Sequence, residues 1–276
     1  MNSKSVSNIH TRFKSYYKEI RDIWESFNLV NYYFDIVHKD IKHKKKDPFI
    51  FNNLLGIKKK LAKDDTLGAI SHLKIKVNPK RTLVDASALF EDYISFLIKT
   101  VYLDCPEKLK LKAQDTSDQK HYVNLTNLII DCKDKEEMVL RLIEEKVMGI
   151  FYGNILDLFT KDKAKLGFAG PKRFNEQHYQ IVLEKLKEIN ARRNIIMHNQ
   201  GKIDRKYLKE VKDSKYKFNS IVKIDSNYLK DAISVFIYLS AKATEFILND
   251  IYKTPPGGTL NTVLKGLLNK TIKNIK

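Results

Sequence analysis

Apolar residues recur at intervals of three and four along most of the chain, a spacing that places them on one side of an α-helix. This spacing predicts helices over residues 8–44, 81–103, 135–160, 174–199 and 226–252. Only ten glycines and six prolines interrupt the 276 residues. The sequence therefore predicts an all-α fold in which these helices pack as a bundle.

Residues 47–80 follow the helical spacing less well. Within them the segment HLKIKV alternates between polar and apolar positions, as a short strand does, until Pro79 ends the alternation. We therefore divide the chain into a basic N-terminal helical region (1–78), a helical bundle (79–253) and a short basic amphipathic tail (254–276). We expect the tail to dock on the bundle rather than on a partner or a membrane surface.

The composition is that of a strongly basic protein with enough hydrophobic residues to form a buried core. Hydrophobic residues make up 43% of the chain, and the net charge of +18 attracts polyanions such as RNA through counterion release. A lysine-rich composition that is general to the proteins of an AT-rich genome would produce the same charge. The charge alone therefore does not define a function. The sequence has no apolar run of membrane-span length and no disulfide or zinc spacing among its cysteines, so we expect a cytoplasmic protein that does not bind membranes.

The segment ARRNIIMHNQG, residues 191–201, concentrates polar side chains near the end of a predicted helix. On a helical wheel, Arg193 falls inside the apolar stripe of this helix, whereas Arg192 points away from the stripe. Asn190, Asn194 and His198 follow one another at i, i+4 and i+8 and form a polar ridge beside the stripe. Gly201 is the expected helix-ending glycine.

This arrangement suits phosphoester cleavage without a metal. A guanidinium on a core-facing stripe requires a partner or a wet cleft, and the helix dipole favours the protonated form of His198. Proton exchange by His198 beside the fixed cation Arg193 is the chemistry that RNA cleavage by its own 2′-hydroxyl requires. The reaction uses a base for the 2′-hydroxyl and an acid for the 5′-oxygen, whereas the motif offers one histidine, so we expect a homodimer with a shared cleft. Capping and ion pairing at a helix end are the alternative explanation for these residues.

The pattern of Arg193, Asn194, three further residues and His198 resembles the motif of the HEPN superfamily. The segments LVDASALFEDYISFLIKTVYLDCPEKLK and RRNIIMHNQGKIDRKYL also resemble the first bundle helix and the exit loop of the RiboL-PSP-like group, so that the resemblance covers residues 80–252. It implies a metal-independent endoribonuclease that acts as a homodimer, in a toxin or antiviral defence context. Arg193 and His198 are then the catalytic pair, and Asn194 is the intervening polar residue.

Some HEPN proteins instead bind RNA, nucleotides or a partner without catalysis. The alternative function is therefore a regulatory scaffold that binds RNA or a partner protein. A regulatory protein such as an antitoxin is an expected partner in either case. We expect no cofactor and no metal, because the sequence lacks a phosphate-binding loop, a serine or cysteine nucleophile motif and clustered metal ligands.

Further residues are expected to support the site or to contact RNA. Asn190, Asn199 and Glu91 are the supporting residues, with Glu91 as the expected partner of Arg193 or, alternatively, a surface carboxylate between helices. Basic residues in two lysine runs and on the motif helix are the expected RNA contacts: Lys44, Lys45, Lys46, Lys58, Lys59 and Arg192. Solvated lysines are the alternative reading of the two runs.

Overall fold

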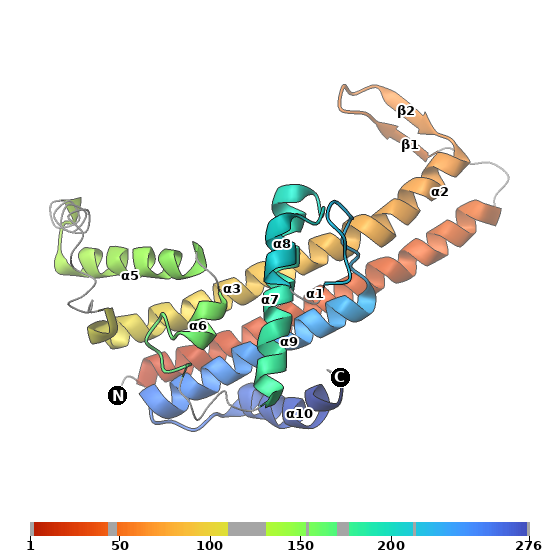
Figure 1. Ribbon diagram of the computed structural model, residues 1–276. Helices are drawn as coiled ribbons and strands as arrows, with labels where there is room; N and C mark the ends of the chain where they lie inside the picture. The colour runs from red at the N-terminus through yellow and green to blue at the C-terminus, as the bar shows by residue number, and fades with distance from the viewer. Residues whose placement is uncertain are drawn as a thin grey trace. The chain divides into compact units, whose positions relative to one another are not determined.

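The computed structural model describes residues 3–43, 49–109, 131–152, 155–169, 177–211 and 214–274. Helices account for most of these residues, and the strands among them form a single two-stranded hairpin, which confirms the predicted all-α class (Figure 1). No described helix combines the length and the apolar character needed to cross a membrane.

The helical elements follow the predicted order, with ends that shift by a few residues. They are α1 (Ser3–His43), α2 (Lys63–His72), the π-helical turn η1 (Leu73–Val77), α3 (Asn78–Asp104), the 3₁₀ turn η2 (Pro106–Leu109), α5 (Lys135–Tyr152), α6 (Leu156–Thr160), α7 (Gln177–Asn199), α8 (Arg205–Glu210), α9 (Ser226–Phe246), the π-helical turn η4 (Ile247–Ile251) and α10 (Gly258–Asn274). The two strands are β1 (Phe49–Asn52) and β2 (Lys58–Leu61), paired antiparallel with Phe49 opposite Leu61.

The strand expected before Pro79 is absent, because the chain there is helical. Proline lacks an amide hydrogen and its ring crowds the carbonyl four residues earlier, so it interrupts a regular α-helix. Here the amide of Asn78 donates to the carbonyl of Leu73, five residues back, which forms a π turn directly before Pro79. The helix therefore continues from α2 through η1 into α3 despite the proline.

The chain forms two compact units, and each of them gathers segments that are distant in sequence. Unit 1 comprises residues 1–17, 89–186 and 236–276, and unit 2 comprises residues 18–88 and 187–235. The helices α1, α3, α7 and α9 each contribute residues to both units. The predicted divisions after residues 78 and 253 describe the order of segments along the chain and stay predictions.

The core of unit 1 is aromatic. Tyr16 on α1 stacks on Tyr93 of α3 with ring centroids 4.4 Å apart, and Phe90 stacks on Phe236 of α9 at 4.8 Å. The Tyr93 hydroxyl shares a hydrogen bond of 2.7 Å with the hydroxyl of Thr244 on α9. Stacking and hydrogen bonding thus join α1, α3 and α9 within this unit.

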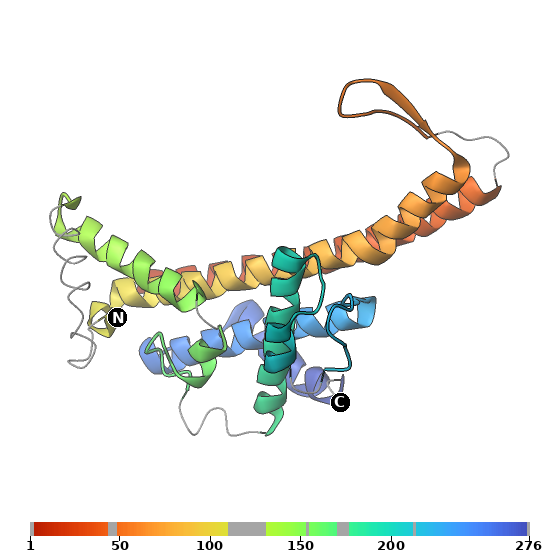
Figure 2. The same cartoon turned by 45° about the horizontal axis from the view of Figure 1, so that its top comes forward.

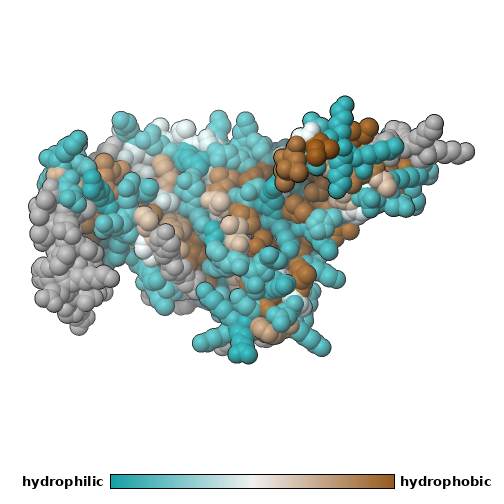
Figure 3. All heavy atoms as spheres, turned by 90° about the horizontal axis from the view of Figure 1, so that it is seen from above, coloured by the Kyte–Doolittle hydropathy of each residue, from teal (hydrophilic) through white to brown (hydrophobic). Residues whose placement is uncertain are grey.

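Unit 2 contains a helical hairpin with a β-hairpin at its end. The second part of α1 runs alongside α2, η1 and the start of α3, as both ribbon views show (Figures 1 and 2). Lys74 donates to Asp35 at 2.5 Å across this pair. Brown side chains gather over the β-hairpin on the right of the space-filling view (Figure 3). They include Leu54 and Leu55 at the turn, both highly exposed.

Candidate functional site at the end of α7

The motif occupies the last two turns of α7, and Gly201 ends the helix as predicted. Gly201 has φ of +80°, a conformation that side-chain-bearing residues rarely adopt. Its amide donates to the Ile195 carbonyl at 2.8 Å, and the Lys202 amide donates to the Asn199 carbonyl at 2.9 Å. These bonds fix the position of the last helical turn and hence of His198 within it.

Arg193, Asn194 and His198 lie at the same helix end but differ in burial. Arg193 and Asn194 are half-buried, and Nη1 of Arg193 donates to Oδ1 of Asn194 at 3.2 Å. His198 is exposed to solvent, so its imidazole can exchange protons with water or a bound molecule. The helix end therefore presents an oriented guanidinium and an accessible imidazole five residues, or about one and a half turns, apart.

The three supporting residues have different surroundings. Asn190 is half-buried on α7, two turns before His198. Asn199 donates from Nδ2 to the Lys202 carbonyl at 2.8 Å and so stabilises the turn that follows the helix. Glu91 is half-buried on α3 in unit 1, and both it and Arg193 have further polar interactions within the molecule. Pairing between Glu91 and Arg193 stays a prediction.

The orientation expected for Arg192 is wrong, because its side chain is only 8% exposed. Its guanidinium lies over the ring of Tyr228, 3.9 Å from the centroid, and donates from Nη1 to the Lys223 carbonyl at 3.0 Å. It also forms an ion pair with Glu188, one turn earlier on α7. Burial raises the pKa of Tyr228, so the phenol stays neutral beneath the cation.

The helical wheel failed for Arg192 because it considers one helix alone. The segment before α9 and the first turn of α9 cover the side of α7 that the wheel assigned to solvent. Tyr216, in that segment, lies 5.4 Å from the guanidinium. Arg192 is thus a structural residue of unit 2, and its predicted contact with RNA is not available at a buried position.

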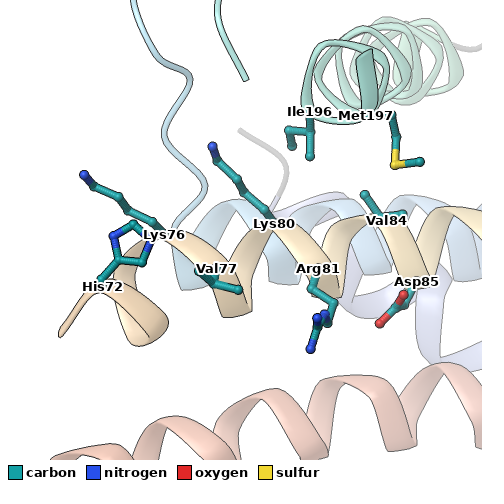
Figure 4. A pocket seen from close by; sticks show the side chains of 9 residues that line it. All are labelled: His72, Lys76, Val77, Lys80, Arg81, Val84, Asp85, Ile196 and Met197. Atoms are coloured by element: carbon teal, nitrogen blue, oxygen red, sulfur yellow. The ribbon is translucent and has the colours of Figure 1, made fainter. Parts of the chain in front are cut away.

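A pocket of about 490 Å³ lies beside the end of α7, within unit 2 (Figure 4). One wall is the helical stretch from the end of α2 through η1 into α3, and the other is the last turn of α7. Its lining combines apolar and charged side chains: Val77, Val84, Ile196 and Met197 are apolar, and His72, Lys76, Lys80, Arg81 and Asp85 are polar or charged. The pocket therefore adjoins the motif.

The basic side chains of the pocket form a ridge along one helix face. His72, Lys76 and Lys80 follow one another at i, i+4 and i+8, and in the close-up they point to the side on which α7 lies (Figure 4). Nζ of Lys80 donates to the carbonyl of Gln200 at 3.2 Å, directly after α7. The expectation of a strand did not indicate this ridge, because side chains four residues apart are neighbours in a helix but lie about 13 Å apart along a strand.

Of the lysines expected to contact RNA, those on the β-hairpin lie within the described residues. Lys58 and Lys59 are exposed on β2, and Phe49 stacks on Phe51 of β1 with centroids 5.6 Å apart. Lys44, Lys45 and Lys46 lie outside the described residues. The hairpin thus combines solvent-exposed lysines with exposed apolar side chains, a composition found on surfaces that track nucleic acid. Its contact with RNA stays a prediction.

Within the described part of the chain, no three or more histidine, cysteine, aspartate or glutamate side chains come together as ligands for a metal ion. An exposed imidazole, a half-buried guanidinium and a basic pocket at one helix end are instead suited to a ligand that contains phosphate groups.

Comparisons of the chain with protein-family models, with curated proteins and with solved structures gave no match. The assignment of a function therefore depends on the residues and the geometry of this chain.

Proposed function

We propose that the protein is a metal-independent endoribonuclease of the HEPN type. The observation on which this proposal rests is the end of α7, where Arg193 and Asn194 are half-buried and hydrogen-bonded to each other and His198 is exposed. A positioned cation with an accessible proton carrier is the minimum that phosphoester cleavage by an internal hydroxyl requires. The spacing of these residues in the sequence supports the same function.

Each motif residue has a role in this reaction. The 2′-hydroxyl of RNA loses its proton to an imidazole and attacks the adjacent phosphorus, and the bond from phosphorus to the 5′-oxygen breaks. The 5′-oxygen takes a proton, which leaves a 2′,3′-cyclic phosphate. His198 exchanges the protons, Arg193 stabilises the negative charge that develops on the phosphorane, and Asn194 orients the guanidinium. DNA lacks the attacking hydroxyl and is not a substrate.

The reaction is most efficient with a separate base and acid, and the motif supplies one imidazole per chain. A two-fold contact at the ends of two α7 helices would bring two copies of His198 to one phosphate, with one as the base and the other as the acid. The exposure of His198 supports this arrangement, since the imidazole is not enclosed within its own chain. We therefore propose a homodimer with a composite site.

A ribonuclease of this kind requires control inside a cell. We propose that it acts in the cytoplasm in a toxin or antiviral defence setting, with a regulatory protein such as an antitoxin as a further partner. The alternative, a non-catalytic module that binds RNA or a partner, shares the expected affinity for RNA but not the cleavage. Cleavage is therefore the property to measure.

The test is incubation of the full chain with single-stranded and structured RNA in the presence of EDTA. We expect products with 2′,3′-cyclic phosphate ends, and a loss of rate of about 100-fold or more in His198→Ala and in Arg193→Ala. His43→Ala is the matched control, because His43 is also an exposed histidine in the last turn of a helix. Wild-type chain that leaves RNA intact, or equal loss in the His43 variant, would contradict the proposal.

A further inference from the structure

The pocket beside α7 is continuous with the motif along the helix. Met197 directly precedes His198, lies one turn after Arg193 and lines the pocket. A molecule held against Met197 is therefore adjacent to the residues that the proposed reaction uses.

The apolar wall of the pocket suits a planar, unsaturated ring. Ile196 and Met197 extend from α7 toward α3, and Val84 extends from α3 toward them (Figure 4). Met197 is 54% exposed, so its thioether is accessible to a molecule bound in the pocket. A thioether makes favourable contacts with aromatic rings and adapts to their shape. A nucleobase would cover this apolar wall.

The basic wall suits the phosphates of the same chain. His72, Lys76 and Lys80 follow one another about one helical turn apart along the stretch from α2 through η1 into α3. Arg81 and Asp85 extend away from α7, so the acidic group of the pocket is directed away from the ridge (Figure 4). The ridge thus places two lysine ammonium groups and an imidazole in a row, all able to contact the phosphate oxygens of a nucleic-acid strand.

We infer that this pocket is a nucleotide subsite for single-stranded RNA. The base lies on Val84, Ile196 and Met197, and the phosphates follow the ridge of His72, Lys76 and Lys80. Because Lys80 is hydrogen-bonded to the carbonyl after α7, the strand leaves the ridge beside the end of the motif helix. The identity of the ligand as RNA rests on the proposed function, whereas the fit of an aromatic ring with phosphates rests on the pocket.

Binding is tested without cleavage by using a fluorescently labelled single-stranded RNA with 2′-O-methyl groups at every position. This probe lacks the attacking hydroxyl, so its Kd reports the subsite whether or not the chain is a nuclease. The variants are Lys76→Glu and Met197→Ser, both at exposed positions. The matched controls are Lys230→Glu on α9, outside the pocket, and Met148→Ser on α5, where the methionine is 52% exposed.

The two variants should weaken binding in different ways. Lys76→Glu should raise Kd about tenfold and reduce the slope of log K against log salt by about 0.7, the value for one lost contact with a single-strand phosphate. Met197→Ser should raise Kd about threefold or more, with an unchanged salt slope, because it removes a contact with a base. The control variants should bind as the wild type does.

The outcomes separate this inference from the proposed ribonuclease. Wild-type affinity in both pocket variants, or equal weakening in the controls, overturns the subsite even if the chain cuts RNA. Weakened binding in the pocket variants alone supports the subsite even if no RNA is cut, in which case the proposed catalysis fails and the subsite belongs to an RNA-binding module. Failure of the wild type to bind the probe overturns the inference.

Discussion

Replacing Arg192 by methionine should destabilise unit 2 by about 3 kcal/mol. The hydrogen bond from this charged group to the Lys223 carbonyl is worth about 1.5–3 kcal/mol, and the stacking over Tyr228 adds about 1–2 kcal/mol at a desolvated position. The ion pair with Glu188 adds little, because the Glu188 side chain is 27% exposed and is hydrated once its partner is lost. The apolar methionine side chain offsets part of this loss.

Replacing Arg193 by methionine should instead have little effect on stability and a large effect on the proposed cleavage. Arg193 is half-buried, so Arg193→Met should reduce the free energy of unfolding by about 1 kcal/mol or less. It should nevertheless abolish the proposed cleavage, because the variant lacks the cation that stabilises the phosphorane. Arg192→Met, at a temperature where it is folded, should retain cleavage. Two adjacent arginines thus separate a structural role from a catalytic one.

The assay is urea unfolding followed by tryptophan fluorescence. Trp24 is the only tryptophan in the chain and belongs to unit 2, where it stacks on Phe27 at 5.6 Å. Its emission therefore reports the unit that contains both arginines. Wild-type stability of Arg192→Met, or a larger loss of stability in Arg193→Met, would refute the reasoning from burial.

Three further predictions concern other parts of the molecule. Gly201→Ala should reduce the free energy of unfolding by about 1–2 kcal/mol, because φ is +80° at this position. Gly149→Ala in α5, where an added Cβ meets open space, should be neutral or stabilising in the same urea titration. Lys59→Glu on the β-hairpin should weaken binding of the 2′-O-methyl RNA and lower its salt slope; an unchanged slope would mean that the hairpin does not contact phosphate. Although burial raises the pKa of Asp157, hydrogen bonds from Lys163 and Lys161 lower it below the usual value. The stability from this lowered pKa is present at neutral pH and is lost as the pH falls through the folded-state pKa. Asp157→Asn should therefore be less stable than the wild type at pH 7 and should lose less stability on acidification. Unfolding at pH 7 and at pH 3 measures both effects.

The periodic spacing of apolar residues was sufficient to predict the helical class and the approximate positions of the main helices. It succeeds because a helix that packs on a core must repeat its apolar residues at intervals close to 3.6, whichever neighbours it has. The helix-ending role of Gly201 was likewise predictable, since the left-handed conformation there is a local property of the backbone. The motif of Arg193, Asn194 and His198 was visible in the sequence for the same local reason.

Residues 72–81 show where local signals conflict. Alternating polar and apolar residues before a proline favour a strand that ends, but the neighbouring helix of unit 2 and a π turn allow the helical path to continue. Side chains four residues apart are neighbours in a helix but lie about 13 Å apart along a strand, so the helical path brought His72, Lys76 and Lys80 close together. The basic ridge thus depended on a helix that the sequence pattern did not predict.

Sequence by itself therefore determined the main helices, their order and the residues of the motif, because these depend on the spacing of residues along one chain segment. Tertiary structure decided which arginine is buried and what lies beside the motif. Arg192 is enclosed by the segment that precedes α9, and the pocket is formed by α7 together with a helical stretch more than a hundred residues earlier in the chain. Burial and pocket shape depend on all the surfaces that meet at a point, and no single helix contains that information.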